Sequence, residues 1–180
     1  MSLKQNRKRF KTDVICRLLV LVLIPIALLP KLHAQEIKLR LLDGRSGKPI
    51  ERSCINVWVG DHQKSALAIH TDENGIAKFH LTADASAVNV TNYWAACGMF
   101  GVSDPTVMYA DTIQINAGYA WCKPNSQEKS WLAINKFPTK HLTDDGEVTA
   151  NACAKVSAKP TPGELTIYVR PLTFWEKLKQ

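Results

Sequence analysis

Short apolar segments with a period of two recur along the chain, and this pattern restricts the fold more than any other feature. Apolar and polar residues alternate over residues 36–42, 54–59, 112–117 and 164–170. A period of two places alternate side chains on opposite faces, as in a strand that is buried on one side. Gly, Pro, Asp and Asn separate these segments. About seven or eight short strands with such turns predict an all-β fold, a β-sandwich.

The same alternation predicts which side chains form the core. If two sheets share one interior, the inward residues of successive strands should meet in a single packed cluster. The residues expected there are Leu39, Val57, Phe79, Ile115 and Ile167.

Residues 45–81 carry the densest set of turn and strand signals. Ser46-Gly47-Lys48-Pro49 is typical of a turn, because Gly permits positive φ and Pro fixes its own φ. Residues 65–70 and 76–81 flank Asp72-Glu73-Asn74-Gly75, whose residue types suit a tight turn. The sequence therefore predicts that these two segments form the arms of a hairpin.

The first 34 residues have the composition of a secretory signal peptide. A basic head precedes an apolar run over residues 18–29, and Ala34 is a small residue at a plausible cleavage point. The run is shorter than the roughly 20 residues that span a bilayer, and Pro25 interrupts it. We expect a signal helix in residues 1–34, one domain in residues 35–180, and a secreted or periplasmic location. The alternative is an uncleaved leader that anchors the domain in a membrane.

The excess of basic residues belongs to the leader. The whole chain has a net charge of +7, but the leader holds seven Lys/Arg and one Asp. The rest of the chain therefore has 16 basic and 15 acidic residues, a net of +1. Nucleic-acid binding requires a basic face on the folded domain. We therefore expect no nucleic-acid partner.

The order of features up to Leu81 resembles that of carboxypeptidase regulatory-like domains. The resemblance rests on Gly47-Lys48-Pro49-Ile50, on the strand Asn56-Val57-Trp58-Val59, and on Thr71-Asp72-Glu73-Asn74-Gly75. It covers about 50 residues. It implies a transthyretin-like or immunoglobulin-like β-sandwich of the kind found in secreted and cell-surface bacterial proteins.

The second half of the chain is similar to small exported proteins of acidobacteria. The similar segments are Asn151-Ala152-Cys153-Ala154-Lys155, Pro160-Thr161-Pro162-Gly163, and the ending that runs from Val169 to Lys177. This similarity implies a stand-alone exported domain. Within the ending, residues 174–178 are expected to form one helical turn against the domain.

Four cysteines follow the leader: Cys54, Cys97, Cys122 and Cys153. An even number behind an export signal favours disulfides, and four cysteines allow three pairings. In the similar exported proteins the most regular pair matches Cys122 and Cys153. That bridge would also tether the long polar segment 140–159. We therefore favour 122–153 together with 54–97, and the alternative is that Cys54 is a buried free thiol.

Catalytic chemistry has little support in the sequence. His70-Thr71-Asp72-Glu73 has the H-x-x-E spacing of zinc carboxypeptidases, but it lies across the predicted turn. A third ligand would have to come from His62, His80 or His141, and a catalytic zinc site needs three protein ligands. The chain also lacks the G-x-S-x-G motif of serine hydrolases and the Tyr-Arg-Gly-Ser ending of the related hydroxyisourate hydrolases. We expect no enzyme activity, no metal and no cofactor.

The remaining hypotheses concern binding. Trp94 and Trp121 lie beside irregular segments, where binding residues tend to occur, and would suit a carbohydrate or small-ligand platform. Large aromatic residues also commonly fill the core of a sandwich. The leading expectation is an exported, non-catalytic module with a structural or interaction role, whose partner is a protein or glycan at the cell envelope or exterior.

Overall fold

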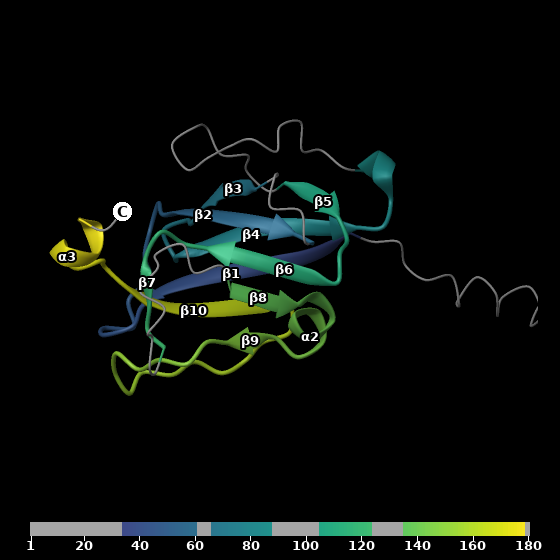
Figure 1. Cartoon of the computed structure of the whole chain (residues 1–180). Helices are drawn as coiled ribbons and strands as arrows, with labels where there is room; N and C mark the ends of the chain where they lie inside the picture. Colours follow the sequence, from purple (N-terminus) through teal and green to yellow (C-terminus); the bar gives the residue numbers. More distant parts are fainter. Residues whose placement is uncertain (1–33, 61–65, 88–104, 124–134, 179–180) are drawn as a thin grey trace, which may run out of the picture. The chain divides into compact units, whose positions relative to one another are not determined.

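The computed structural model describes residues 34–60, 66–87, 105–123 and 135–178. It divides the chain into two units, Met1–Leu32 and His33–Gln180. The predicted signal helix belongs to the first unit and lies outside the described residues. In the second unit the described residues form ten strands in two sheets, an all-β sandwich (Figure 1).

The larger sheet has six strands, and its two central strands come from opposite ends of the domain. The strand order is β5-β4-β1-β10-β7, and β9 also pairs with β10. Strands β1 and β10 run parallel, with Leu39 opposite Leu165 and Leu41 opposite Ile167. The bounds are β1 (Gln35–Asp43), β4 (Ile76–Thr82), β5 (Thr106–Met108), β7 (Ala120–Trp121), β9 (Glu147–Val148) and β10 (Glu164–Arg170).

The smaller sheet has four antiparallel strands in the order β3-β2-β6-β8. These are β2 (Cys54–Val59), β3 (Leu67–His70), β6 (Thr112–Asn116) and β8 (Asn135–Pro138). Helical elements of the described chain are short: η1 (Ala85–Ala87), α2 (Thr139–Asp144) and α3 (Phe174–Lys177). Within the described ranges, no helix has the length and apolar content that crossing a bilayer requires.

The predicted core is confirmed. Leu39, Val57, Phe79, Ile115 and Ile167 all belong to one buried cluster, and each is fully inaccessible to solvent. Alternation explains this result, because β1 buries Ile37, Leu39 and Leu41 while Lys38 and Arg40 remain partly exposed. The two inner faces together form one hydrophobic interior.

The predicted hairpin of residues 65–81 is wrong. The turn itself exists, since Asp72 N–H donates to Ile76 O (2.9 Å) and Gly75 has a φ of +71°. However, β3 pairs with β2 in the smaller sheet, and β4 pairs with β1 and β5 in the larger sheet. The turn therefore connects the two sheets of the sandwich. Turn residues fix the chain reversal, but they do not decide whether the flanking strands pair with each other.

The long polar segment 140–159 contains most of α2 and the whole of β9. Leu142 of α2 is fully buried and belongs to the core, which explains why this polar stretch forms a helix against the sheets. Beyond β9 the chain is largely irregular until β10 begins. The Cys122–Cys153 disulfide, predicted from the sequence, connects this segment to the residue that follows β7.

Candidate functional site

The most unusual surface of the described domain is the helical turn α3 and the residue after it. In a surface helix the apolar face normally packs on the core and the polar face meets water. Here Phe174, Trp175 and Leu178 are 67%, 70% and 62% exposed. Positions i, i+1 and i+4 share one side of a helix, so these three side chains form a single apolar face. This face, which we call the α3 apolar face, points into solvent.

The polar side of α3 is the side that is fixed to the domain. Arg170, the last residue of β10, donates two hydrogen bonds to the Glu176 carboxylate, at 2.8 and 2.7 Å. A bidentate guanidinium–carboxylate pair holds both groups in one orientation. Thr173 and Glu176 also form a capping box, with Thr173 N–H donating to Glu176 Oε2 (2.7 Å). These bonds turn Glu176 toward the sandwich and leave the apolar face outward.

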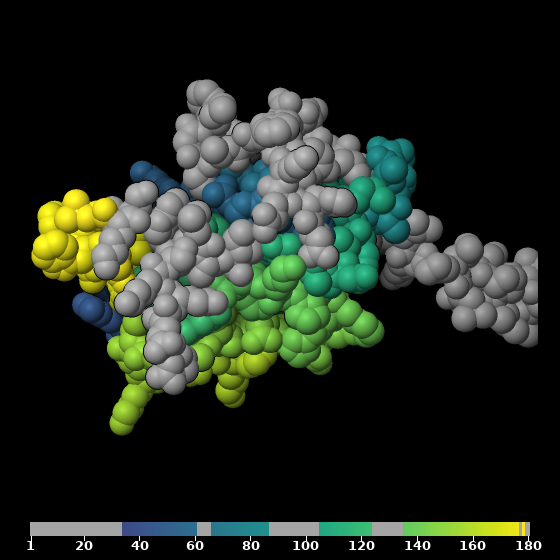
Figure 2. All heavy atoms as spheres, in the orientation of Figure 1, coloured from purple at the N-terminus to yellow at the C-terminus, as the bar shows by residue number. Residues whose placement is uncertain are grey.

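Figures 1 and 2 place α3 at the end of the sandwich where β10 finishes. Because β10 runs parallel to β1, this is the opposite end of β1 from Gln35. The turn is therefore an exposed element at this end of the described domain. The sequence predicts the helical turn correctly, and the turn contacts the domain through Glu176 and not through its aromatic side chains.

The Arg170 guanidinium and the Thr173 N–H together lower the pKa of Glu176 from 4.5 to about 2. Because the folded pKa lies below the ordinary value, the pair stabilises the turn above about pH 5. This contribution is lost as the pH falls from 4.5 to 2. Glu176 is about one-third exposed, so the contribution should be at most about 1 kcal/mol.

We expect Arg170→Gln to raise the pKa of Glu176 toward its ordinary value, because it removes the largest of the causes that lower it. A carbon-detected NMR titration of the side-chain carboxyl measures this change. Arg40→Gln is the matched control, since Arg40 forms a similar bidentate pair with Glu164 on the larger sheet. It should leave Glu176 unchanged. A Glu176 pKa that stays near 2 in Arg170→Gln would show that the guanidinium does not hold the turn.

Of the predicted cysteine pairs, 122–153 is present, with an S–S distance of 2.06 Å. Cys54 is also disulfide-bonded, which removes the free-thiol alternative. Its partner lies outside the described residues, and so does Cys97. The 54–97 pairing therefore stays a prediction.

Of the two tryptophans predicted as a ligand platform, Trp94 lies outside the described residues. Trp121 is 8% exposed and belongs to the hydrophobic core. Its ring stacks on Phe137 with the centroids 6.2 Å apart, and Lys123 Nζ lies 5.2 Å from its centroid. These neighbours leave little of the Trp121 ring for a ligand.

The H-x-x-E residues lie where the turn begins. His70 ends β3, Glu73 is in the turn, and both are exposed. The proposed third ligands are not brought to them: His80 is on β4 and pairs with Glu36 (4.0 Å), and His141 is on α2. His62 lies outside the described residues. In the described part of the chain, no three His, Cys, Asp or Glu side chains converge as a metal site would require.

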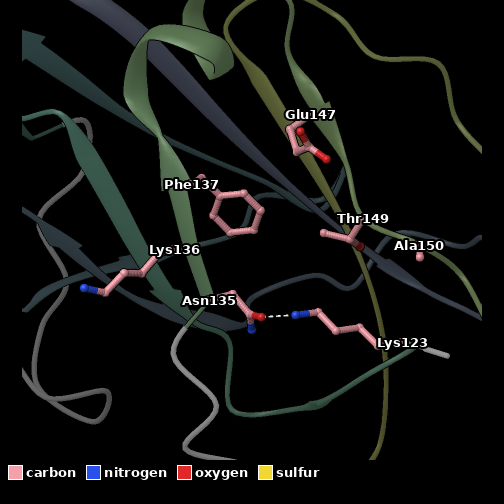
Figure 3. Close-up of a pocket in the computed structure, with 7 residues that line it drawn as sticks. All are labelled: Lys123, Asn135, Lys136, Phe137, Glu147, Thr149 and Ala150. Atoms are coloured by element: carbon pink, nitrogen blue, oxygen red, sulfur yellow. Dashed lines mark hydrogen bonds between the residues drawn. The ribbon is translucent and has the colours of Figure 1, made fainter. Parts of the chain in front are cut away.

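A pocket of about 290 Å³ opens between β8 and β9 (Figure 3). Lys123, Asn135, Phe137 and Glu147 are among its lining residues. Lys123 donates to Asn135 Oδ1, and Glu147 Oε2 lies 3.1 Å from His141 Nε2. A charged ligand would have to compete with these contacts, so the pocket is a weaker candidate than the α3 apolar face.

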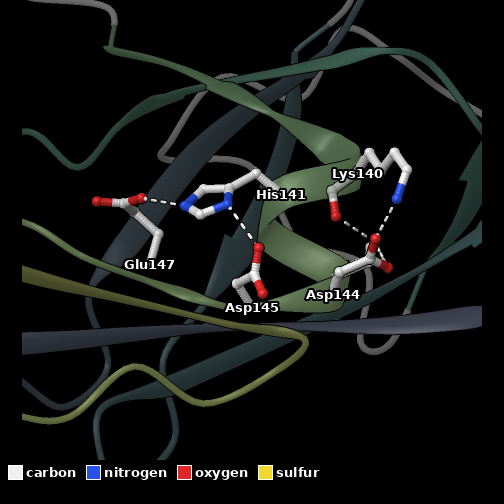
Figure 4. Close-up of polar contacts among 6 residues, drawn as sticks. Lys140, His141, Asp144, Asp145 and Glu147 are labelled. Carbon is white, nitrogen blue, oxygen red and sulfur yellow. Dashed lines mark hydrogen bonds and ion pairs between the residues drawn. The ribbon is translucent and has the colours of Figure 1, made fainter.

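His141 lies between two carboxylates at the end of α2 (Figure 4). Its Nδ1 is 3.0 Å from Asp145 Oδ2, and its Nε2 is 3.1 Å from Glu147 Oε2. The neighbouring Lys140 pairs with Asp144. Both ring nitrogens of His141 therefore face acidic partners, and neither is presented to a substrate. The cluster links the end of α2 to β9 as an exposed ion-pair network.

Comparison of the chain with protein-family models, with curated proteins and with solved structures gives no match. The described fold is thus an all-β sandwich whose family is not identified by these comparisons.

Proposed function

We propose that this chain is an exported, non-catalytic β-sandwich that acts as an interaction module at the cell envelope or exterior. The α3 apolar face is the surface through which it binds. The observation that carries the proposal is the orientation of α3, whose polar residue Glu176 is fixed to the domain while Phe174, Trp175 and Leu178 are exposed. Leaving large aromatic side chains in water is unfavourable, and clustered exposed apolar residues are typical of binding surfaces.

Two further points support an interaction role. The exposed pair consists of Trp and Phe, and large aromatic residues are the side chains most enriched in the cores of protein interfaces. The bonds from Arg170 and Thr173 fix the turn in place, so less conformational entropy is lost when a partner binds. The resemblance to carboxypeptidase regulatory-like domains agrees with this role and with a transthyretin-like form of the sandwich.

Fractionation of bacterial cells that express the full chain tests the proposal. We expect the wild-type chain to sediment with the envelope fraction. Phe174→Ser/Trp175→Ser should lower the ratio of sedimented to soluble chain at least about fivefold, a change that corresponds to about 1 kcal/mol of binding free energy. Mass spectrometry of the exported chain before and after reduction tests leader removal and cysteine pairing together.

The matched control is Met108→Ser/Tyr109→Ser. Met108 and Tyr109 are 42% and 43% exposed at the end of β5, so this variant removes a similar pair of exposed apolar side chains from another site. It should sediment like the wild type. Equal sedimentation of Phe174→Ser/Trp175→Ser and the wild type, with both folded by circular dichroism, would refute the α3 apolar face as the binding surface.

A further inference from the structure

We infer that the partner of the α3 apolar face is the surface of a lipid bilayer with anionic headgroups. This inference rests on the proposed interaction role and names the partner chemistry for the same surface. Three observations favour a bilayer over a sugar chain or a second protein: the ring geometry, the paired backbone of the turn, and the charge around it.

The two exposed rings do not form a flat platform. The Phe174 and Trp175 centroids are 5.5 Å apart, and their planes meet at 75°. A platform for successive sugar rings needs aromatic faces that lie nearly in one plane. Two nearly perpendicular rings on an exposed turn instead suit a medium that adapts to their shape. The interfacial region of a bilayer is such a medium, and Trp is enriched there.

Backbone N–H groups of the turn are already hydrogen-bonded within the protein, which favours contact with an environment that contains little water. An unpaired N–H group is costly in an apolar environment, so exposed helix ends are a barrier to insertion. Here Thr173 N–H donates to Glu176 Oε2 (2.7 Å) and Glu176 N–H donates to Thr173 Oγ1 (3.3 Å). Leu178 N–H donates to Phe174 O (3.1 Å). The capping box therefore provides hydrogen-bond acceptors for backbone N–H groups in the same segment that carries the exposed apolar side chains.

The charge of the segment suits anionic headgroups. Glu176 is neutralised by Arg170 within the domain. In the sequence, Lys177 and Lys179 stand on either side of Leu178. Apolar residues combined with basic residues are the composition of segments that lie in the interface of an anionic bilayer. The three apolar residues and two lysines fall within six consecutive positions, 174–179.

A retained apolar leader would also bind lipid. The experiment therefore needs a signal that comes from α3 itself.

The probe is a set of vesicles made of phosphatidylcholine alone or of phosphatidylcholine with 30% phosphatidylglycerol, a fraction chosen to give an anionic surface. Each set carries brominated acyl chains that quench nearby tryptophan. The Trp175 signal of the full chain is the difference between the spectra of the wild type and of Trp175→Phe. We expect this difference signal to shift to shorter wavelength and to be quenched in the anionic vesicles.

Two variants test the apolar and the charged parts separately. Phe174→Ser should reduce the quenching of Trp175, and Lys177→Gln/Lys179→Gln should weaken vesicle binding about fivefold for each lysine removed. Phe174 is 67% exposed, so its replacement should leave the fold intact, which circular dichroism verifies. High salt should reproduce the effect of the lysine changes.

The inference is overturned if Trp175 is not quenched in either vesicle set, even when the chain sediments with the vesicles. It is also overturned if quenching is equal in the neutral and anionic vesicles, because the headgroup charge would then play no part. If Phe174→Ser/Trp175→Ser still releases the chain from the cell envelope while vesicles do not quench Trp175, the interaction role stands and the partner is a protein or glycan. If neither effect occurs, both proposals fail.

Discussion

Replacing Cys122 and Cys153 together by alanine is expected to lower the free energy of unfolding by about 3–4 kcal/mol. The two cysteines are 31 residues apart, and a bridge that closes a loop of this length removes that amount of conformational freedom from the unfolded chain. For a domain of this size the loss corresponds to a fall of roughly 10–15 °C in the midpoint of thermal unfolding. Urea unfolding and calorimetry under oxidising conditions measure both quantities.

The contacts around this bridge explain why it matters in the folded state as well. Asn151 Nδ2 donates to the carbonyls of Gly44 and Val156, both at 2.9 Å, which holds the irregular segment against the end of β1. A Cβ at Gly44 would lie 2.3 Å from Cys122 Sγ, so the bridge packs directly on the backbone there. Without the bridge, the segment is held by hydrogen bonds such as these and the one from Ala152 N–H to Cys122 O.

Chemical reduction is not a substitute for the double variant, because Cys54 is disulfide-bonded too and would be reduced at the same time. Cys54→Ala is the appropriate comparison, since it leaves the 122–153 bridge in place. A loss of less than about 1 kcal/mol in the Cys122→Ala/Cys153→Ala variant would mean that the bridge adds little to the packing of this segment.

Gly146→Ala is expected to cost about 2–4 kcal/mol. Gly146 follows α2 with a φ of +75°, and its N–H donates to the carbonyls of His141 and Leu142. A side chain in this left-handed region is strained, and a Cβ here would also lie 2.0 Å from Thr161 O. Backbone atoms cannot move aside as a flexible side chain can, so the segment before β10 would have to shift.

Gly118→Ala is the matched control for this prediction. Gly118 has a φ of +67°, but an added Cβ there would meet nothing within 4 Å. This variant should therefore show only the conformational cost, about 1 kcal/mol. Denaturant unfolding of both variants separates the two contributions. If Gly146→Ala and Gly118→Ala lower the free energy of unfolding equally, the close contact with Thr161 does not contribute to the loss.

The individual strands were predictable because their alternation has one physical cause, burial on one side. Strand β10 matches the predicted residues 164–170, and Leu165, Ile167 and Val169 are fully buried as the pattern requires. The central position of β10 also buries Thr166 and Tyr168 on its other face, which the alternation does not predict. The pairing of the strands was not predictable. Alternation with a period of two predicts which face of a strand is buried. It does not predict which strand lies beside it or in which direction that neighbour runs. This is why the parallel β1–β10 pair was not foreseen and the hairpin prediction failed.

The candidate site was predictable only in part. Residues 174–178 were expected to form a helical turn, and Thr173-x-x-Glu176 is the sequence signature of a capping box that would have supported it. The direction of its apolar face depends on the Arg170–Glu176 pair. The sequence contains many acidic and basic residues that could pair with each other, so this choice of partners is settled by the folded backbone.

The central position of β10 has a consequence for how the domain is made. The sheet that contains β1 stays open along its middle until residues 164–170 take their place beside it. A ribosome or a translocation pore delivers those residues only after the other described strands of both sheets. The chain therefore cannot complete its hydrophobic core before residues 164–170 have emerged. In addition, most of its contacts join positions far apart in the sequence, and such contacts slow folding. Such a delay would suit the export that we propose, because an exported polypeptide crosses the membrane before it folds.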